Sequence, residues 1–289
     1  MKTGYGSFAI IGGDKRQLYC ARSLSDDGYS VALGGFDSIA EMNKVEVTTP
    51  FEAALISEAI ILPLPCVNEK GRISAPFCKN DIELTDDLVT AMKGKRIFCG
   101  MKQRLEEVCP IIAGNACDYY DREDFIINNA YVTAEGALEL AMRSFEGTIN
   151  GAECLVCGYG RIGKILTDML KSLGAKVTTS ARNPRDIAWI ELCGVKSVRT
   201  EELNKLGGFD IIFNTIPAMI MTPLLLAKIA LNAVVIDLVS GEGGVDKYAA
   251  ERLGISYIHA LSLPGKAAPK TAGEIIKNTI YNILEEDDR

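Results

Sequence analysis

The residues best suited to chemistry form one glycine-rich run, Gly158-Tyr159-Gly160-Arg161-Ile162-Gly163. It directly follows an apolar stretch at 154–157 and opens a segment whose apolar residues recur at helical spacing. In a strand–turn–helix unit, the first glycine permits a sharp bend, the second lets the backbone approach a pyrophosphate, and the third lets helix and strand pack closely. The helix N-terminus then offers N–H groups to the phosphates. The run predicts a dinucleotide site; the alternative is a turn whose glycines serve packing alone.

The residues after the next expected strand, at 176–179, indicate which dinucleotide binds. A site that prefers NAD carries an acid near this point to bond the ribose 2′-hydroxyl, and this chain has none. Arg182 can instead pair with a 2′-phosphate, and Ser180 and Asn183 can add neutral hydrogen bonds. The sequence therefore predicts NADP, unless Arg182 is only a solvated turn residue.

Two further strand ends are expected to line the nicotinamide side of the cofactor. They follow the apolar stretches at 210–213 and 234–238. Ligands in open α/β sheets lie beyond the carboxyl ends of the strands, so these ends should face the same ligand as the glycine-rich run. The residues expected there are Thr215, Ile216, Pro217 and Leu238.

The elements that must position these residues are short apolar stretches alternating with helical patterns, which predict parallel sheets covered by helices. The two halves also look alike. A strand runs into Gly12 and into Gly158, and a second glycine follows 16 residues later, at Gly28 and Gly174. The prediction is an α/β fold of two Rossmann-like, doubly wound parallel-sheet domains with a cleft between them; coincidence between two common units is the alternative.

The expected boundaries place a substrate-side domain at 1–128 and an NADP-binding domain at 129–265. A C-terminal helix within 266–289 should pack back on the first domain, because its apolar residues lie on one face. A connecting helix is expected at 133–145. The expected strands cover residues 8–11, 30–33, 59–62, 96–99, 154–157, 176–179, 210–213, 234–238 and 257–258.

The first half departs from the dinucleotide pattern. Its turn reads Gly12-Gly13-Asp14-Lys15-Arg16-Gln17, with glutamine in place of the third glycine. Lys15 and Arg16 bring two fixed positive charges to a helix start, which suits a small carboxylate better than a second dinucleotide. Asp14, Lys15 and Arg16 are therefore candidate substrate residues; a surface loop whose charges face water is the alternative.

Composition excludes several classes of function. The chain has 289 residues, a formal net charge of −7, one histidine and nine cysteines. This charge argues against nucleic-acid and membrane binding, and the single histidine argues against a histidine-based metal site. Cys154 and Cys157 form a CxxC on one expected strand and so point to opposite faces, which argues against a zinc or redox pair. No secretion signal or membrane span is expected, and the protein is predicted to be cytoplasmic.

Six motifs occur in order along nearly the whole chain, namely the turns at 12–17 and 158–163, Ala181-Arg182, the run 214–217, Leu263-Pro264-Gly265-Lys266 and the run 268–273. Together they resemble the dipicolinate synthase A-subunit family. The resemblance implies an NADP-dependent enzyme of spore-forming bacteria, which converts a hydroxylated tetrahydropyridine dicarboxylate to dipicolinate by loss of water and ring oxidation. It also implies a flavoprotein-like partner, the dipicolinate synthase B subunit, in the mother-cell cytoplasm.

The substrate of that reaction carries two carboxylates, and oxidation removes a hydride and a proton from its ring. Lys266 and Lys270 can bind a carboxylate, or they can be surface charges that flank a helix. The family-like stretch from Asn129 to Gly136 suggests that Asn129 and Thr133 bind substrate and that Glu135 transfers the proton. Thr133 can also cap the connecting helix. The stretch departs from the family at Val132, where the family places proline.

Two other functions remain open. One is a regulatory or scaffold protein that binds NADP but performs no chemistry, because no residue is an obvious base. The other is a different small-acid dehydrogenase of the same architecture, although the sequence lacks the histidine–acid pair of the 2-hydroxy-acid type. His259, the sole histidine, is expected to be a hydrogen-bonded strand-end residue. A homo-oligomer is not excluded.

Overall fold

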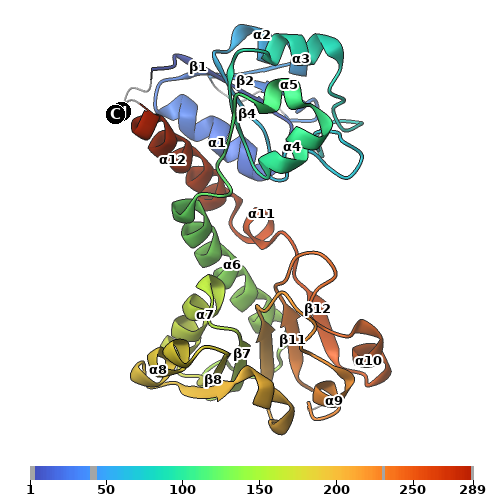
Figure 1. Cartoon of the computed structure of the whole chain (residues 1–289), viewed down its shortest axis with the longest axis vertical. Helices are drawn as coiled ribbons and strands as arrows, with labels where there is room; N and C mark the ends of the chain where they lie inside the picture. Colours follow the sequence, from blue (N-terminus) through green and yellow to red (C-terminus); the bar gives the residue numbers. More distant parts are fainter. Residues whose placement is uncertain (1–3, 40–43, 230–231, 288–289) are drawn as a thin grey trace. The chain divides into compact units, whose positions relative to one another are not determined.

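The chain folds into two compact units in a computed structural model that describes residues 4–39, 44–229 and 232–287. Unit 1 combines residues 1–129 with residues 268–289, and unit 2 is residues 130–267. Each unit is an α/β layer structure built on one parallel sheet (Figure 1). No helix among the described residues has the length and apolar character needed to cross a membrane.

Unit 1 contains six parallel strands in the order β3-β2-β1-β4-β5-β6. The chain starts in the middle of the sheet, moves to one edge, then returns and continues to the other, which is the doubly wound arrangement. The strands are β1 (Ser7–Ile11), β2 (Ser30–Gly34), β3 (Val45–Thr48), β4 (Ala59–Ile61), β5 (Arg96–Cys99) and β6 (Ala116–Asp118). Its helices are α1 (Lys15–Asp26), α2 (Pro50–Ile56), α3 (Asp86–Met92), α4 (Lys102–Val108), α5 (Pro110–Ala113) and α12 (Pro269–Asp287).

Unit 2 repeats this topology, with the strand order β12-β11-β10-β7-β8-β9. The strands are β7 (Glu153–Cys157), β8 (Lys176–Ala181), β9 (Lys196–Arg199), β10 (Ile211–Asn214), β11 (Val234–Asp237) and β12 (Ser256–His259). The helical segments are α6 (Glu123–Ser144), which begins in unit 1, α7 (Arg161–Ser172), α8 (Pro184–Leu192), the 3₁₀ helix η1 (Thr200–Lys205), α9 (Pro223–Leu226), α10 (Lys247–Arg252) and α11 (Leu263–Ala267). The predicted pair of doubly wound α/β domains is therefore confirmed.

Side-chain alternation along the central strands builds a core on each face of each sheet. In β1, Phe8 and Ile10 pack with α1 and α12, whereas Ala9 and Ile11 pack on the opposite face. In β7, Cys154 packs with α6 and α7, whereas Cys157 packs with α9 and α10. This is the period-two pattern of a strand buried on both sides.

The C-terminal helix α12 lies alongside α1 in unit 1 (Figure 1). Gly273 permits the close approach, because a Cβ at that position would stand within 3 Å of the backbone of Arg16 and Cys20. Ile276, Ile280 and Ile283 complete the buried face. A helix far along the chain thus closes one face of the first sheet.

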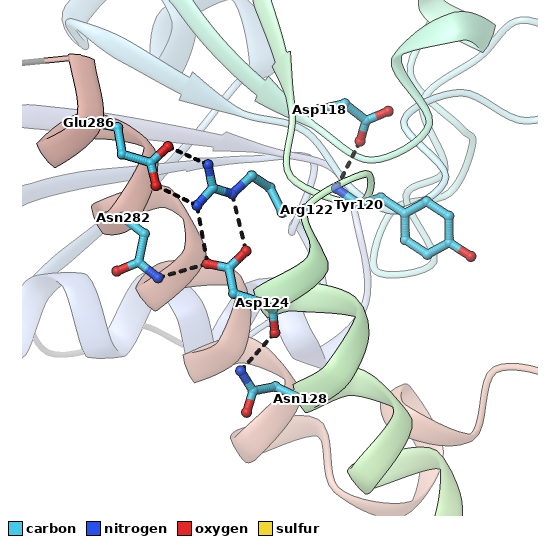
Figure 2. Close-up of polar contacts among 7 residues, drawn as sticks. All are labelled: Asp118, Tyr120, Arg122, Asp124, Asn128, Asn282 and Glu286. Carbon is cyan, nitrogen blue, oxygen red and sulfur yellow. Dashed lines mark hydrogen bonds and ion pairs between the residues drawn. The ribbon is translucent and has the colours of Figure 1, made fainter. Parts of the chain in front are cut away.

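Polar contacts fasten the end of α12 to the start of α6 (Figure 2). Arg122 donates to both oxygens of Glu286, at 2.5 and 2.8 Å, and its Nε donates to Asp124 at 3.1 Å. Asn282 Nδ2 donates to Asp124 at 2.7 Å. Since all four residues belong to unit 1, this cluster anchors the end of α12 within that unit.

Three strands were not expected from the sequence, namely β3, β6 and β9, and each is an edge strand. Their sequences, VEVT, ACD and KSVR, are half-exposed and lack an apolar run. An edge strand contacts fewer core residues, so its pattern is weak. The connecting helix is also longer than expected, because α6 starts at Glu123 and the expected helix started at 133.

Candidate functional site

The glycine-rich turn follows β7, at the point where the strand order of unit 2 reverses between β7 and β10. Gly158 has a φ of +100°, and a Cβ there would collide with Thr215 Oγ1 and Ile216. A Cβ on Gly163 would stand well inside 3 Å of the Gly158 carbonyl oxygen, so only glycine lets α7 start this close to the strand. Around Gly160 a Cβ would meet nothing within 4 Å. The backbone at Gly160 is therefore open to a ligand.

The first turn of α7 provides an anion-binding end. Gly160 is the N-cap residue and supplies no side-chain hydrogen bond, so no cap occupies the leading N–H groups of this 12-residue helix. Tyr159 is half-buried, and Lys164 Nζ lies 5.4 Å from its ring centroid. Uncapped N–H groups and the helix dipole favour a phosphate at this end. Arg161 and Ile162 form the first two positions of the helix.

Ser180 lies beneath the turn and does not face the ribose, contrary to the role expected from the sequence. Its side chain is fully buried, and its Oγ accepts a hydrogen bond from Gly158 N at 3.1 Å. Gly158 N also lies 3.2 Å from the Ser180 carbonyl oxygen. Because β8 continues through Ala181, the serine belongs to the buried strand. It positions the turn and is inaccessible to a 2′-phosphate.

The residues just after β8 are exposed. Arg182 follows the last strand residue with its side chain in solvent. Asn183 is the N-cap of α8, and its Oδ1 accepts from Arg185 N at 2.9 Å, so its amide oxygen has a structural partner. Arg185 is a second exposed guanidinium in the first turn of α8, 3.5 Å from Asp186. Arg185 was not predicted from the sequence, although a second arginine three positions after Arg182 could have indicated it.

The ends of β10 and β11 lie at the same edge of the sheet as the glycine-rich turn. Asn214, the last residue of β10, pairs in register with Cys157 on one side and with Asp237 on the other. Thr215 Oγ1 donates to the Cys157 carbonyl oxygen at 2.9 Å. Ile216 is half-buried, Pro217 is exposed, and Leu238 is buried. The structure therefore brings the four expected nicotinamide-side residues to one edge.

In unit 1 the corresponding turn is already filled by its own chain. A Cβ on Gly12 would collide with Ile73 and with the Ser74 carbonyl oxygen, and Gly13 N donates to Ser74 O at 2.7 Å. Asp14 caps α1, with its carboxylate accepting from Arg16 N at 2.9 Å. Segment 72–82 thus covers the position where a pyrophosphate would approach.

The two candidate cations of this turn differ in their surroundings. Arg16 Nε contacts both carboxylate oxygens of Asp14, at 3.0 and 3.2 Å, and its Nη2 donates to the Leu64 carbonyl oxygen at 3.0 Å. Its side chain is only 12% exposed. Lys15 is exposed. The expectation that both charges meet a substrate carboxylate therefore has to be revised, because Arg16 is engaged in structural contacts.

The expected residues of the connecting helix lie inside α6. Thr133 cannot cap a helix that began ten residues earlier at Glu123, so that expectation is wrong. Asn129 also lies within α6, at the end of the first of the two segments that make up unit 1. Glu135 is exposed and lines a groove of about 950 Å³ in unit 2, together with Lys164, Asp168 and Met142. Glu135 thus occupies the α6–α7 side of the unit.

The two lysines expected to bind substrate belong to different units. Lys266 lies on α11 in unit 2 and is exposed. Lys270 lies in the first turn of α12 in unit 1, where it lines a small hollow with Tyr19, Arg22 and Glu274. Both remain candidates for anion binding.

His259 and the CxxC pair have structural roles. His259 Nε2 lies 2.8 Å from the Val239 carbonyl oxygen, so that nitrogen must carry a proton and donate. Burial raises the pKa of Cys154 and of Cys157 to about 12, which leaves both as unreactive thiols. Among the described residues, no group of three or more histidine, cysteine and acidic residues could hold a metal ion.

Taken together, the duplicated sheet order and the glycine-rich turn at the switch point define a two-domain Rossmann-type α/β protein. Sequence comparison then specifies the family. The family of N-terminal domains of the dipicolinate synthase A subunit matches residues 7–120. The dipicolinate synthase A subunit of Bacillus subtilis (strain 168) is 33% identical over 296 residues, which cover 99% of this chain and 98% of the relative. The chain belongs to the dipicolinate synthase A-subunit family.

Solved structures of the family have the same fold. The crystal structure of the Bacillus subtilis dipicolinate synthase A chain superposes with a TM-score of 0.86 at 32% identity, covering 99% of this chain and 97% of that one. The A subunit from Bacillus halodurans gives a TM-score of 0.85 at 32% identity, covering 96% of this chain and 97% of that one. The resemblance noted in the sequence is therefore confirmed over both units.

Proposed function

We propose that this chain is an NADP-dependent oxidoreductase that forms dipicolinate, pyridine-2,6-dicarboxylate, from a hydroxy-tetrahydrodipicolinate in sporulation. NADP binding is inferred from one observation, the open main chain at Gly160, together with the exposed Arg182 at the end of the neighbouring strand β8. Membership in the dipicolinate synthase A-subunit family supports the reaction.

The residues present fit a phosphorylated dinucleotide. Gly158 and Gly163 have room for no side chain, whereas the space beside Gly160 is empty, so the backbone can contact a pyrophosphate directly. The uncapped start of α7 favours the phosphate charge. Arg182 offers a planar guanidinium to a 2′-phosphate, and Arg185 adds a second positive charge nearby in the sequence.

The reaction divides into loss of water and oxidation of the ring. A bound NADP⁺ would supply the acceptor for a hydride from a ring carbon, and one proton would be released as the dihydropyridine becomes aromatic. Aromatisation supplies driving force, so the protein chiefly needs to orient the ring and bind its carboxylates. Exposed Lys15, Lys266 and Lys270 are the proposed carboxylate ligands, with Asn129 as a further polar contact and Glu135 as the candidate for moving the proton.

The proposal extends to partner and location. The Bacillus subtilis relative is named as the A subunit of dipicolinate synthase. We propose that this chain works with a flavoprotein-like B subunit in the cytoplasm, and that it binds neither nucleic acid nor membrane. The acidic net charge of −7 supports the last point, because polyanionic surfaces would repel it.

One set of titrations tests the proposal. The purified chain is titrated calorimetrically with NADP⁺, NAD⁺ and 2′,5′-ADP, and NADPH formation from the hydroxy-tetrahydrodipicolinate is then followed with and without the B subunit. We expect tighter binding of NADP⁺ than of NAD⁺, and NADPH formation. NADP⁺ binding without any NADPH formation in either condition would indicate a non-catalytic role. Failure to bind NADP⁺ would refute the proposal.

A further inference from the structure

A fully buried carboxylate lies at the end of β11. Asp237 Oδ1 accepts hydrogen bonds from Asn214 Nδ2 at 2.9 Å and from Val239 N at 3.2 Å. Its Oδ2 accepts from Gly244 N at 2.7 Å and lies 3.5 Å from Tyr257 OH. The two oxygens of this carboxylate thus accept three hydrogen bonds of 3.2 Å or less, which satisfies a polar group that has no contact with water.

The same carboxylate bonds both ends of one loop. Val239 N begins the loop that follows β11 and Gly244 N ends it, so the side chain of Asp237 closes residues 239–244 into a ring. His259 Nε2 donates to the Val239 carbonyl oxygen at 2.8 Å and holds the same end from β12. The residues between, Ser240 to Glu242, are exposed. The loop is therefore fixed at its base while its tip faces solvent.

The network also fixes the loop that follows β10. Asn214 donates to Asp237 with its Nδ2 and accepts from Ile216 N with its Oδ1, at 3.1 Å. The Gly244 carbonyl oxygen accepts from Ile220 N at 3.1 Å and from Met221 N at 3.0 Å. Loops 215–221 and 239–244 thus have a common support, and Asp237 lies at its centre.

The loop backbone is closed tightly over the carboxylate. Gly243 has a φ of +83°, and a Cβ there would stand within 3 Å of Asp237 Oδ2. A Cβ on Gly244 would meet Asn214 Nδ2 within 3 Å. No side chain fits at either position, so the loop conformation and the carboxylate depend on each other.

We propose that Asp237 is the positioning residue that holds loops 215–221 and 239–244 against the nicotinamide end of the cofactor. This inference rests on the proposed function, because the two loops follow β10 and β11 at the same edge of the sheet as the glycine-rich turn. Stability alone does not explain a buried carboxylate, because apolar residues of similar volume often stabilise a fold equally well. Hydride transfer, in contrast, depends on placing the ring to within a fraction of an ångström, which a set of directed hydrogen bonds provides.

The test measures binding of the two ends of the cofactor separately in the Asp237→Asn variant. The adenosine end is measured by calorimetry with 2′,5′-ADP, and the nicotinamide end by the fluorescence change of NADPH on binding. Asn keeps the volume but places an NH₂ group against the N–H of Val239 or Gly244. We expect 2′,5′-ADP affinity within about twofold of wild type and a loss of about tenfold or more in NADPH affinity, with most of the fluorescence change lost. In turnover, kcat should fall more than the KM for NADP⁺ rises.

Asp210→Asn is the matched control. Asp210 is also a carboxylate at a strand end of this sheet, accepting from Glu153 N at 2.9 Å, but it lies at the amino end of β10. The same chemical change there should leave both titrations as in wild type. If Asp210→Asn lost the nicotinamide signal as well, the effect would be general loosening of the unit and the inference would be overturned.

Other results would overturn either the inference or the proposed function. A folded Asp237→Asn with wild-type NADPH fluorescence would overturn the inference while leaving the proposed function intact, and so would equal losses for 2′,5′-ADP and NADPH. If Asp237→Asn does not fold, Gly243→Ala replaces it, because that Cβ displaces the loop without removing the charge. A folded Gly243→Ala with an unchanged nicotinamide signal would then refute the inference. Wild-type protein that binds neither ligand would refute the proposed function, and this inference with it.

Discussion

Ser180 Oγ and Gly158 N are joined by a hydrogen bond of 3.1 Å, entirely inside the protein. The second strand of unit 2 therefore supports the glycine-rich turn from below. In Ser180→Ala, the turn keeps its bond to the Ser180 carbonyl oxygen and loses the one to the hydroxyl. We expect unfolding in urea to show a loss of about 1 kcal/mol, and NADP⁺ and NAD⁺ to weaken by the same factor. A selective loss of NADP⁺ would show that Ser180 does meet the 2′-phosphate.

Arg182 should account for the choice of cofactor. Arg182→Glu replaces a solvent-exposed cation by an anion, which would repel a 2′-phosphate. We expect calorimetry to show a loss of NADP⁺ affinity of about tenfold or more, and little change for NAD⁺. Lys196→Glu, an exposed cation at the start of β9, serves as the charge control and should change neither. Equal losses for both cofactors in Arg182→Glu would remove the argument for 2′-phosphate recognition.

Lys15 and Arg16 should respond differently to truncation. Lys15→Ala removes an exposed charge, and we expect a higher KM for the proposed dicarboxylate substrate, unchanged cofactor affinity and unchanged stability. Arg16→Ala also breaks the contacts to Asp14 and to Leu64 O. It should lower the free energy of unfolding by about 1–3 kcal/mol, because a partly buried charged hydrogen-bond network is lost. An unaltered KM in Lys15→Ala would mean that this charge only faces water.

Gly273 should be intolerant of any side chain. Gly273→Ala places a Cβ within 3 Å of the backbone of α1, so the two helices must separate. We expect a loss of about 1–3 kcal/mol in urea unfolding of unit 1, even though alanine favours helix. Asn278→Ala, at an exposed position of the same helix, is the control and should be neutral or slightly stabilising. If Gly273→Ala matched that control, α12 would not pack closely on α1.

Asp27 makes the attachment of α12 sensitive to acid. Partial burial opposes its ionisation, but hydrogen bonds from Lys277, at 2.6 Å, and Tyr281, at 2.8 Å, outweigh it and lower the pKa of Asp27. A lowered pKa in the folded state means that the stabilisation is present above the ordinary carboxyl pKa of about 4 and is lost as the pH falls through the lowered value.

The variant Asp27→Asn tests this linkage. Because Asp27 is 41% exposed, we expect it to cost only about 0.5–1 kcal/mol at neutral pH. The difference from wild type should shrink as the pH falls below about 4, because protonation removes the same charge from the wild-type protein. Urea unfolding at several pH values measures this, and a difference that is independent of pH would contradict the assignment.

Much of the architecture could be predicted because the buried strands carry it locally. Six strands have apolar sequences and are fully or mostly buried in the structure, namely β1, β4, β5, β7, β10 and β11. The edge strands β3, β6 and β9 carry too little apolar pattern to be recognised. The length of α6 was missed because the helix begins in unit 1 and runs into unit 2, whereas the domain boundary was expected before the connecting helix.

The sequence by itself determined the features whose residues are neighbours in the chain. The turn from Gly158 to Gly163, the arginine after β8 and the absence of an acid there are all readable without a structure, because backbone sterics and local charge decide them. Only the tertiary structure decided the partners of Ser180, Arg16 and Asp237. Asp237 meets Asn214 and Tyr257 only through the register of three parallel strands. Such contacts join residues far apart in the chain, and no local pattern specifies which of them will meet.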